Sequence, residues 1–282
     1  MNSLSGRKIL VTGSTGFVGS HIVKGLPKSL VIANKDKRVD LRNKNDVLKL
    51  RKSDMVIHTA GAIPKSNVVE LSYYFENNVL GTLNVLEYCI KKDIEKLVYV
   101  STYIYGNPEY CPIDEDHPIK PHTPYTESKY LAERLCKFYY EKYGLKIVIL
   151  RPFGIFGKFQ KPGLLIPNLI YSLKTGKRMV VTNKKSKRDY LFIDDFVRLV
   201  EKILQRDQKF EIFNVGSGIS HSFEEVIRTI EKITKKKLNI SYLNDMKTFI
   251  PEIRADIKKI TKATGWTPST SLEDGLRLAL QP

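Results

Sequence analysis

Cysteine is scarce in this chain of 282 residues, and its three cysteines, Cys89, Cys111 and Cys136, lie far apart. Cysteines this few and this scattered exclude a disulfide framework and a cysteine-based zinc site. The sequence also lacks an apolar run long enough to span a membrane, and residues 1–10 lack the apolar core of a signal peptide. We therefore expect a soluble, cytoplasmic protein with no membrane partner and no bound metal.

Acidic residues are also few, since 30 Asp and Glu stand against 47 Lys and Arg, and the formal net charge is +17. A protein this basic can bind nucleic acid, an anionic membrane or an anionic small molecule. Its lysines are spread along the chain, and the small clusters at 34–38, 183–188 and 234–238 are not interleaved with aromatic residues. This distribution is typical of a solvated surface. We expect no nucleic-acid partner, although a phosphate-rich substrate would use a few of these lysines.

Hydrophobic residues make up 42% of the chain, which is enough to bury a sizeable core. Short apolar runs typical of strands alternate with amphipathic runs typical of helices. This alternation predicts an α/β fold, a Rossmann-type doubly wound parallel sheet with helices on both faces. The expected strands cover 8–12, 29–34, 54–61, 96–101, 146–151 and 210–216, and two long helices are expected at 70–92 and 125–144.

The pattern changes after residue 153, where prolines and glycines mark loops and shorter elements. We therefore expect two domains. A dinucleotide-binding domain would cover residues 1–153, with 189–215 returning to it. A smaller C-terminal α/β lobe for the substrate would be formed by 154–188 and 216–282.

Three glycines follow the first expected strand in "KILVTGSTGFVGSHIV", residues 8–23. Gly13 can adopt backbone angles closed to other residues, Gly16 lets the backbone approach a diphosphate, and Gly19 lets the next helix pack closely on the strand. That helix offers N–H groups at its N-terminus to an anion. A glycine triplet alone can be a tight turn, but between a strand and a helix it predicts a dinucleotide site.

Three side chains beyond this turn could carry chemistry. Ser101 ends an expected strand, which puts its hydroxyl at the carboxyl edge of the sheet. Tyr125 and Lys129 are four residues apart on one expected helix, so they share a face. A lysine ammonium beside a phenol lowers the pKa of the phenol, and such a tyrosine can exchange a proton with a sugar oxygen. Taken alone, a Tyr-x-x-x-Lys pair is more often a surface tyrosine beside a lysine.

These features occur in the order and spacing of the extended short-chain dehydrogenase/reductases. Along nearly its whole length the chain resembles their nucleotide-sugar branch, the NAD-dependent epimerase/dehydratase family, which includes epimerases, dehydratases and reductases. The segments that carry the resemblance are "TGSTGFVGSHIV", "DMVIHTAGAI", "NNVLGTLNVLEYC", "STYIYG", "PYTESKYLAE", "RDYLFIDDFV" and "GWTPSTSLEDGL".

The resemblance implies a role for each matching residue. Tyr125 would be the acid/base, Lys129 would hold the nicotinamide ribose and tune Tyr125, and Ser101 would help to bind the sugar oxygen. The implied substrate-binding residues are Asn78, Thr102, Arg188 and Arg254, of which Arg188 could instead pair with Asp189 or Asp194, and Asn78 could brace a loop. The implied cofactor-binding residues are Gly13, Thr15, Gly16, Phe17, Val18, Gly19, Asn34, Lys35, Arg38, Asp40, Leu41, Ala60 and Lys129.

Two departures from the family pattern bear on which reaction and which substrate to expect. The family's dehydratases carry an Asp-Glu pair just after the catalytic hydroxyl, and here those positions are Thr102 and Tyr103, so dehydration is not expected. The family's R-x-x-N-V-Y-G segment becomes "RPFGIFG", with Gly154 in place of the asparagine. One polar contact to the substrate would therefore be missing.

The cofactor is predicted from the end of the second strand. An NAD site of this type needs a carboxylate about 20 residues after the first glycine. Counting from Gly13 leads to Ala33 and Asn34, and Asp36 lies among basic residues at 35–38. These residues could meet a 2′-phosphate or form a charged surface turn. We expect NADP(H), with NAD(H) as the alternative.

The leading interpretation is an enzyme that reduces a 4-keto nucleotide-diphosphate sugar with NADPH, using Tyr125 as the proton donor. The alternative is a nucleotide-sugar 4-epimerase with retained NAD. A non-catalytic NADP(H)-binding protein is a third, although the intact Ser101, Tyr125 and Lys129 argue against it. A homodimer is expected through the helices at 70–92 and 126–143.

Overall fold

The computed structural model describes residue 4 and residues 6–28, 30–33, 39–64 and 70–281. The chain divides into two compact units. Unit 1 contains Met1–Gly106, Pro118–Pro152 and Val197–Phe213, and unit 2 contains Asn107–His117, Phe153–Phe196 and Asn214–Pro282. This division differs from the predicted domains, because residues 107–117, 153, 189–196 and 214–215 were expected in the first domain and belong to unit 2.

Unit 1 is built on one sheet, whose strands lie in the order β2-β1-β3-β4-β5-β9. Neighbouring strands from β2 to β5 run parallel, which confirms the predicted Rossmann-type sheet. The strand order changes direction at β1, so the carboxyl ends of β1 and β3 form the switch point where ligands of such sheets bind. The strands are β1 (Ile9–Thr12), β2 (Val31–Ala33), β3 (Met55–His58), β4 (Lys96–Val100), β5 (Lys146–Pro152) and β9 (Phe210–Val215).

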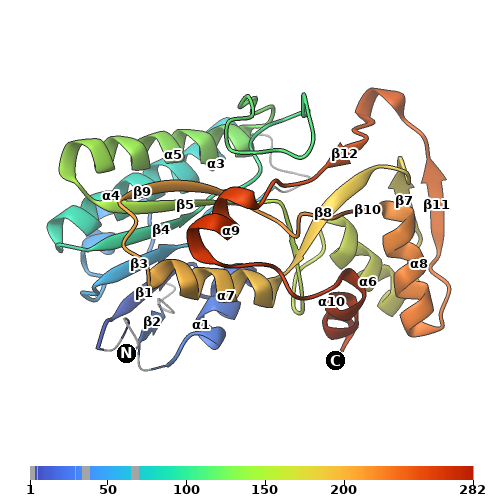
Figure 1. The fold of residues 1–282 in the computed structure, drawn as a ribbon, viewed down its shortest axis with the longest axis horizontal. Helices are drawn as coiled ribbons and strands as arrows, with labels where there is room; N and C mark the ends of the chain where they lie inside the picture. The colour runs from blue at the N-terminus through green and yellow to red at the C-terminus, as the bar shows by residue number, and fades with distance from the viewer. Residues whose placement is uncertain (1–3, 5, 29, 34–38, 65–69, 282) are drawn as a thin grey trace. The chain divides into compact units, whose positions relative to one another are not determined.

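Helices cover both faces of this sheet. α4 (Gly81–Lys91) and α5 (Pro124–Tyr143) lie over one face, and α1 (Phe17–Gly25) and α7 (Ile193–Leu204) lie over the other (Figure 1). The core between the sheet and α4 and α5 contains both buried cysteines, Cys89 and Cys136. Burial raises the pKa of each thiol well above its usual range.

The helix expected at 70–92 is not a single α-helix. It begins as α3 (Leu71–Tyr74), widens into a π-helical segment, η1 (Phe75–Leu80), and continues as α4. Such wide turns inside α-helices are frequent at functional sites. Here the π-helical segment contains Asn78, which is buried and hydrogen-bonded outside its own helix. A short helix, α2 (Lys44–Leu48), precedes β3.

α5 has clear sequence signals at both ends. At its start the Thr123 hydroxyl accepts from the amide of Thr126, the Thr126 hydroxyl accepts from the amide of Thr123, and Pro124 occupies the first turn. At its end Gly144 adopts a φ of 72°, the left-handed conformation that favours glycine. The helix therefore holds Tyr125 and Lys129 in its first two turns.

Unit 2 contains smaller sheets. β8 (Lys187–Phe192) pairs with β10 (Ser220–Ser222), β12 (Glu252–Ile253) and β6 (Gly154–Phe156). β7 (Met179–Thr182) and β11 (Ile240–Leu243) form a separate parallel pair. The remaining elements are α6 (Leu165–Thr175), α8 (Phe223–Thr234), the 3-10 turn η2 (Met246–Thr248), α9 (Lys258–Thr264) and α10 (Leu272–Leu280).

Over the described ranges, no helix is both long and apolar enough to cross a bilayer. Three or more His, Cys, Asp or Glu side chains are nowhere grouped as metal ligands in this part of the chain.

Candidate active site

The glycine turn connects β1 to α1 at the switch point of the sheet. Gly13 has a φ of 69°, and a Cβ there would lie 2.6 Å from the amide nitrogen of Ala60. A Cβ at Gly19 would lie 2.2 Å from the carbonyl oxygen of Gly13. Glycine is therefore required at both positions, for the backbone conformation at Gly13 and for close packing of α1 at Gly19.

The start of α1 has the form that a diphosphate site needs. Its N-cap is Gly16, which makes no side-chain hydrogen bond to the first turn. Thr15 is exposed, and Phe17 and Val18 are half-buried in the turn that follows. The predicted contacts of these residues with a dinucleotide stay predictions.

Two residues predicted to contact the cofactor, Asp40 and Leu41, lie beyond β2. The carboxylate of Asp40 accepts from the Arg42 guanidinium at 2.7 and 3.0 Å, and this arginine lowers the pKa of Asp40. The carbonyl of Leu41 accepts from the side chain of Asn84 at 2.8 Å. Asn34, Lys35 and Arg38 lie outside the described residues, so their predicted roles stay predictions.

A buried histidine joins the end of β1 to α4. The Nδ1 atom of His58 lies 2.7 Å from the hydroxyl of Thr12, and its Nε2 atom lies 3.1 Å from the hydroxyl of Thr82. Burial lowers the pKa of His58 to about 3, and the charge of Lys129 adds to this effect. His58 is therefore neutral and links two elements beside the glycine turn.

Asn78 braces the loop after β3 against α5. Its Oδ1 accepts from the amide of Ala62 at 2.7 Å, and its Nδ2 donates to Ser128 at 2.9 Å and to the carbonyl of Ala62 at 3.2 Å. The hydroxyl of Ser128 in turn donates to the carbonyl of Tyr125. This geometry matches the bracing alternative, and the predicted contact of Asn78 with a substrate stays a prediction.

Lys129 is buried behind the end of β4. Its Nζ donates to the carbonyl of Val100 at 2.8 Å and lies 4.2 Å from the ring centre of Tyr99. Burial lowers the pKa of Lys129 to about 8, while nearby Glu133 opposes this shift.

The pKa of Tyr125 differs from the prediction. The sequence predicted that Lys129 lowers the pKa of Tyr125, but burial raises it. A side-chain hydrogen bond with Thr102 acts in the opposite direction and lowers the pKa. The main reason for the difference is that burial of the phenol disfavours its charged form. Tyr125 is therefore a protonated phenol at neutral pH.

Ser101 faces a buried ion pair. Its hydroxyl lies 2.5 Å from Oε1 of Glu133. The guanidinium of Arg151 donates to both oxygens of Glu133 at 2.7 to 3.2 Å, and the two side chains are 2% and 3% exposed. Arg151 also donates to the Tyr105 hydroxyl at 2.8 Å. The catalytic role that resemblance implied for Ser101 stays a prediction.

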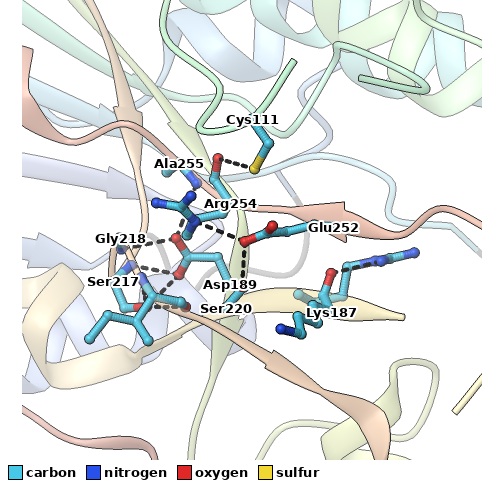
Figure 2. A network of polar contacts seen from close by, with 11 residues as sticks. Cys111, Lys187, Asp189, Ser217, Gly218, Ser220, Glu252, Arg254 and Ala255 are labelled. Atoms are coloured by element: carbon cyan, nitrogen blue, oxygen red, sulfur yellow. Dashed lines mark hydrogen bonds and ion pairs between the residues drawn. The ribbon is translucent and has the colours of Figure 1, made fainter. Parts of the chain in front are cut away.

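Arg188 lies on β8 in unit 2, one residue before a buried aspartate. Its Nη1 donates to the carbonyls of Lys187 and Ile250, and its guanidinium lies 5.3 Å from the ring centre of Phe223. The carboxylate of Asp189 instead accepts from the backbone around the 217–218 turn and from Ala255 (Figure 2). Burial raises the pKa of Asp189 against these hydrogen bonds.

Arg254 belongs to the same network. Its Nε donates to Glu252 at 2.9 Å, and Glu252 also accepts from Ser220 at 2.6 Å (Figure 2). An anionic ligand at Arg254 would therefore meet a guanidinium already oriented by a carboxylate. The predicted phosphate contacts of Arg188 and Arg254 stay predictions.

Gly154 has a structural explanation. It pairs with Tyr190 in the β6–β8 register, and a Cβ at this position would lie 2.4 Å from the carbonyl oxygen of Asp189. The close approach of β6 to β8 therefore leaves no room for an asparagine side chain on this backbone.

Sequence reasoning missed His58, Glu133 and Arg151, and it named Asp189 only as a possible partner of Arg188. The signals were present, since each lies inside or beside a segment that resembles the family: "DMVIH", "SKYLAE", "RPFG" and "RDY". Glu133 also follows Lys129 by four residues, so both share one helix face. Which partner each residue finds depends on elements distant in the sequence.

Comparison with known proteins agrees with this arrangement. The profile of the NAD dependent epimerase/dehydratase family matches residues 9–216. A protein of Methanocaldococcus jannaschii with a provisional UDP-glucose 4-epimerase name is 32% identical, and the match covers 95% of this chain and 96% of that protein.

Solved structures match both units. RMD from Pseudomonas aeruginosa, complexed with NADPH, gives a TM-score of 0.89 at 27% identity and 97% coverage of both chains. UDP-glucose 4-epimerase from Thermus thermophilus, in complex with NAD, gives 0.87 at 30% identity, again with 97% coverage of both chains. Because the profile matches most of the chain and each of these solved structures covers nearly all of it, the chain belongs to the NAD-dependent epimerase/dehydratase family that its motifs resemble.

Proposed function

We propose that this protein is an NAD(P)(H)-dependent nucleotide-sugar oxidoreductase that reduces a 4-keto sugar nucleotide. The observation that carries the proposal is that α5 holds Tyr125 and the buried Lys129 four residues apart, with the Lys129 ammonium donating to Val100 at the end of β4. Because burial raises the pKa of its phenol, Tyr125 holds a proton at neutral pH. A keto oxygen that becomes a hydroxyl needs such a donor.

The glycine turn lets α1 pack tightly at the end of β1, because a Cβ at Gly13 or Gly19 would clash with the backbone of Ala60 or Gly13. The diphosphate would lie at the N-terminus of α1, where backbone N–H groups and the helix dipole favour an anion. A bound NADPH would supply the hydride that reduces the carbonyl carbon, and NADP⁺ would be released. The residues proposed to hold it are Gly13, Thr15, Gly16, Phe17, Val18, Gly19, Asn34, Lys35, Arg38, Asp40, Leu41, Ala60 and Lys129. Of these, Lys35 and Arg38 would meet the 2′-phosphate.

The chain's own contribution is proton transfer and orientation. The O–H bond of Tyr125 breaks as a new O–H bond forms on the sugar oxygen, so the ketone becomes a secondary alcohol and Tyr125 a phenolate. The Thr102 side chain acts to lower the pKa of Tyr125, which favours that phenolate. Solvent returns the proton to Tyr125 after the product leaves.

A 4-epimerase is the second candidate, favoured by the names of similar proteins from Methanocaldococcus jannaschii and Thermus thermophilus. An epimerase oxidises and re-reduces the same carbon with one retained NAD. The same residues serve both reactions, and cofactor handling separates them.

The first experiment is a calorimetric titration of nucleotide-stripped protein with NADPH and with NADH. A preference for NADPH of about tenfold, or about 1.4 kcal/mol, supports the reductase. NAD that cannot be stripped from the purified protein, or a preference for NADH, supports the epimerase.

A turnover assay follows, with 4-keto nucleotide sugars and NADPH in one arm and UDP-glucose alone in the other. Tyr125→Phe should abolish turnover in the productive arm, because the variant has no phenolic proton. Tyr143→Phe is the matched control, since Tyr143 is exposed at the far end of the same helix. Full activity of Tyr125→Phe would contradict the proposal.

A further inference from the structure

The ammonium of Lys129 is buried without a counter-ion. Lys129 is 5% exposed, and burial lowers its pKa to about 8, so the side chain is still mostly charged at neutral pH. Among the residues that the structure describes, none forms an ion pair with Lys129, and Glu133, four residues further along α5, is paired with Arg151. A buried charge is costly unless other groups compensate it. Lys129 therefore needs a partner of another kind.

Two consecutive residues of β4 provide that partner. The Lys129 ammonium donates to the carbonyl of Val100 at 2.8 Å, and it lies over the Tyr99 ring, 4.2 Å from the ring centre. An ammonium this close to a ring is attracted by the negative charge of the ring face, most strongly where water is excluded. Tyr99 is fully buried, so that condition is met.

The Tyr99 ring is itself held in place by its neighbours. It belongs to the core between the sheet and α4 and α5, together with Ala132 and Cys136. Its centre also lies 5.6 Å from the centre of the His58 ring on β3. Side chains in such cores are close-packed and keep their rotamers. The ring therefore offers the ammonium a fixed surface.

A ring leaves more of the ammonium to a ligand than a carboxylate would. An ammonium has three N–H donors and no acceptor. The carbonyl of Val100 takes one donor, whereas a ring face attracts the charge as a whole. The chain thus compensates the buried charge of Lys129 and still leaves N–H groups for a ligand. A carboxylate in the same place would take donors and neutralise the charge.

We propose that Tyr99 is a positioning residue, whose ring face holds the charged Lys129 at the carboxyl end of β4. The inference rests on the proposed function only for the task of Lys129, which is to donate to the cofactor. Tyr99 acts through Lys129 and touches no ligand itself. Phenylalanine offers the same ring face, so the hydroxyl of Tyr99 is not needed for this role.

The first test measures the pKa of Lys129 and needs neither substrate nor cofactor. Fluorine withdraws negative charge from a ring face with little change in ring volume. Tyr99→Phe is the reference, and phenylalanines with one, two and three ring fluorines are placed at the same position. Lysine labelled with ¹³C at Cε reports each pKa, and the Lys129 signal is identified by its loss in Lys129→Met. We expect the pKa to fall with each fluorine, by about 1 in total, because a weaker ring face disfavours the charged form.

The transition near pH 8 can be attributed to Lys129. The other titratable groups that face it are Glu133 and Cys136 on α5, His58 on β3 and Tyr99 on β4. Burial lowers the pKa of His58 to about 3 and raises the pKa values of Cys136 and Tyr99 well above their usual ranges. Glu133 is held in its ion pair.

Two controls come from the same unit. Lys96, at the opposite end of β4, is also buried with a pKa lowered to about 8, and it donates to the carbonyl of Ile203. Its pKa should stay constant throughout the series. Trifluorophenylalanine in place of Tyr139, a core residue further along α5, should leave the pKa of Lys129 unchanged. A Lys129 pKa that does not respond to fluorine at position 99, or that rises, would overturn the proposal.

Cofactor binding provides the second test. When the pKa of Lys129 falls from about 8 to about 7, its charged fraction falls about fivefold near pH 8 and hardly at all near pH 6. Calorimetry should therefore show NADPH binding about fivefold weaker in the trifluorinated protein than in Tyr99→Phe near pH 8, and nearly equal binding near pH 6. Equal affinities near pH 8, despite different Lys129 pKa values, would count against the proposed function of Lys129 alone. A wild type that binds neither NADPH nor NADH would do the same, because the fluorine series still decides the role of Tyr99.

Discussion

The Nε2 atom of His58 lies 3.1 Å from the hydroxyl of Thr82, and that hydroxyl lies 2.5 Å from the carbonyl oxygen of Asn78. Since a carbonyl only accepts, Thr82 donates to Asn78 and accepts from His58. His58 therefore carries its proton on Nε2, and its Nδ1 accepts from Thr12 at 2.7 Å. One neutral tautomer thus connects the strand before the glycine turn to the π-helical segment.

This histidine should make the protein sensitive to acid. Its pKa is about 3 when folded, against about 6.5 in an unfolded chain. Between those values the unfolded state binds a proton that the folded state does not, so stability falls as pH falls, by about 1.4 kcal/mol per pH unit. Urea unfolding at several pH values should show this slope in the wild type and a smaller one in His58→Gln. His221→Gln, at an unrelated position on β10, is the control, and equal slopes in all three proteins would contradict the prediction.

Breaking the buried ion pair between Arg151 and Glu133 should lower the free energy of unfolding. We expect Glu133→Gln to lower the free energy of unfolding by about 3–5 kcal/mol, because it leaves the Arg151 charge buried without a counter-charge. Glu141→Gln, on the exposed part of the same helix, should change it by less than about 1 kcal/mol. Replacing both partners, in Glu133→Leu with Arg151→Met, should cost less than the sum of the single changes. Additive losses in denaturant unfolding would argue against direct coupling.

Asp195 should hold the C-terminal segment of unit 2. Its carboxylate accepts from the amides of Ser269 and Thr270 at 2.9 and 3.0 Å, and its carbonyl accepts from the indole of Trp266. Asp195→Ala should cost about 2–4 kcal/mol, since the partly buried amides of Ser269 and Thr270 lose their acceptor. Asp194→Ala is the control, because Asp194 is the exposed neighbour on the same helix. Limited proteolysis after residue 264 should accelerate only in the Asp195 variant.

The glycine turn permits a test that separates the cost of a steric clash from the cost of backbone strain. Gly13 and Gly144 have nearly equal φ values of 69° and 72°, but only at Gly13 would a Cβ meet other atoms, with Ala60 nitrogen at 2.6 Å. Gly144→Ala should therefore cost about 1 kcal/mol from backbone strain alone. Gly13→Ala should cost more and should abolish dinucleotide binding in calorimetry. Wild-type affinity in Gly13→Ala would remove the turn from the proposed cofactor site.

Local sequence signals predicted most of unit 1. The run "KILVT", the glycines after it and the capped helix ending at Gly144 each carry their conformation in a few neighbouring residues. The long helix at 70–92 was predicted without its π-helical segment, because that wide turn depends on Asn78 reaching the backbone of Ala62 in another loop. Residues 107–117 were assigned to the first domain, since nothing local reveals that Ile113 pairs with Ala255.

The sequence by itself determined the Rossmann-type sheet, the family and the set of candidate residues, because strand and helix periodicity, glycine spacing and motif order are properties of short segments. The tertiary structure alone decided how those residues are charged and oriented. Tyr125 and Lys129 are four residues apart on one helix. Burial nevertheless raises the pKa of Tyr125, and the Lys129 ammonium donates to Val100. Ser101 and Glu133 lie in different elements, yet the serine hydroxyl is hydrogen-bonded to that carboxylate. Desolvation and hydrogen-bond partners depend on which distant elements pack together, so only the folded chain fixes the chemistry of its side chains.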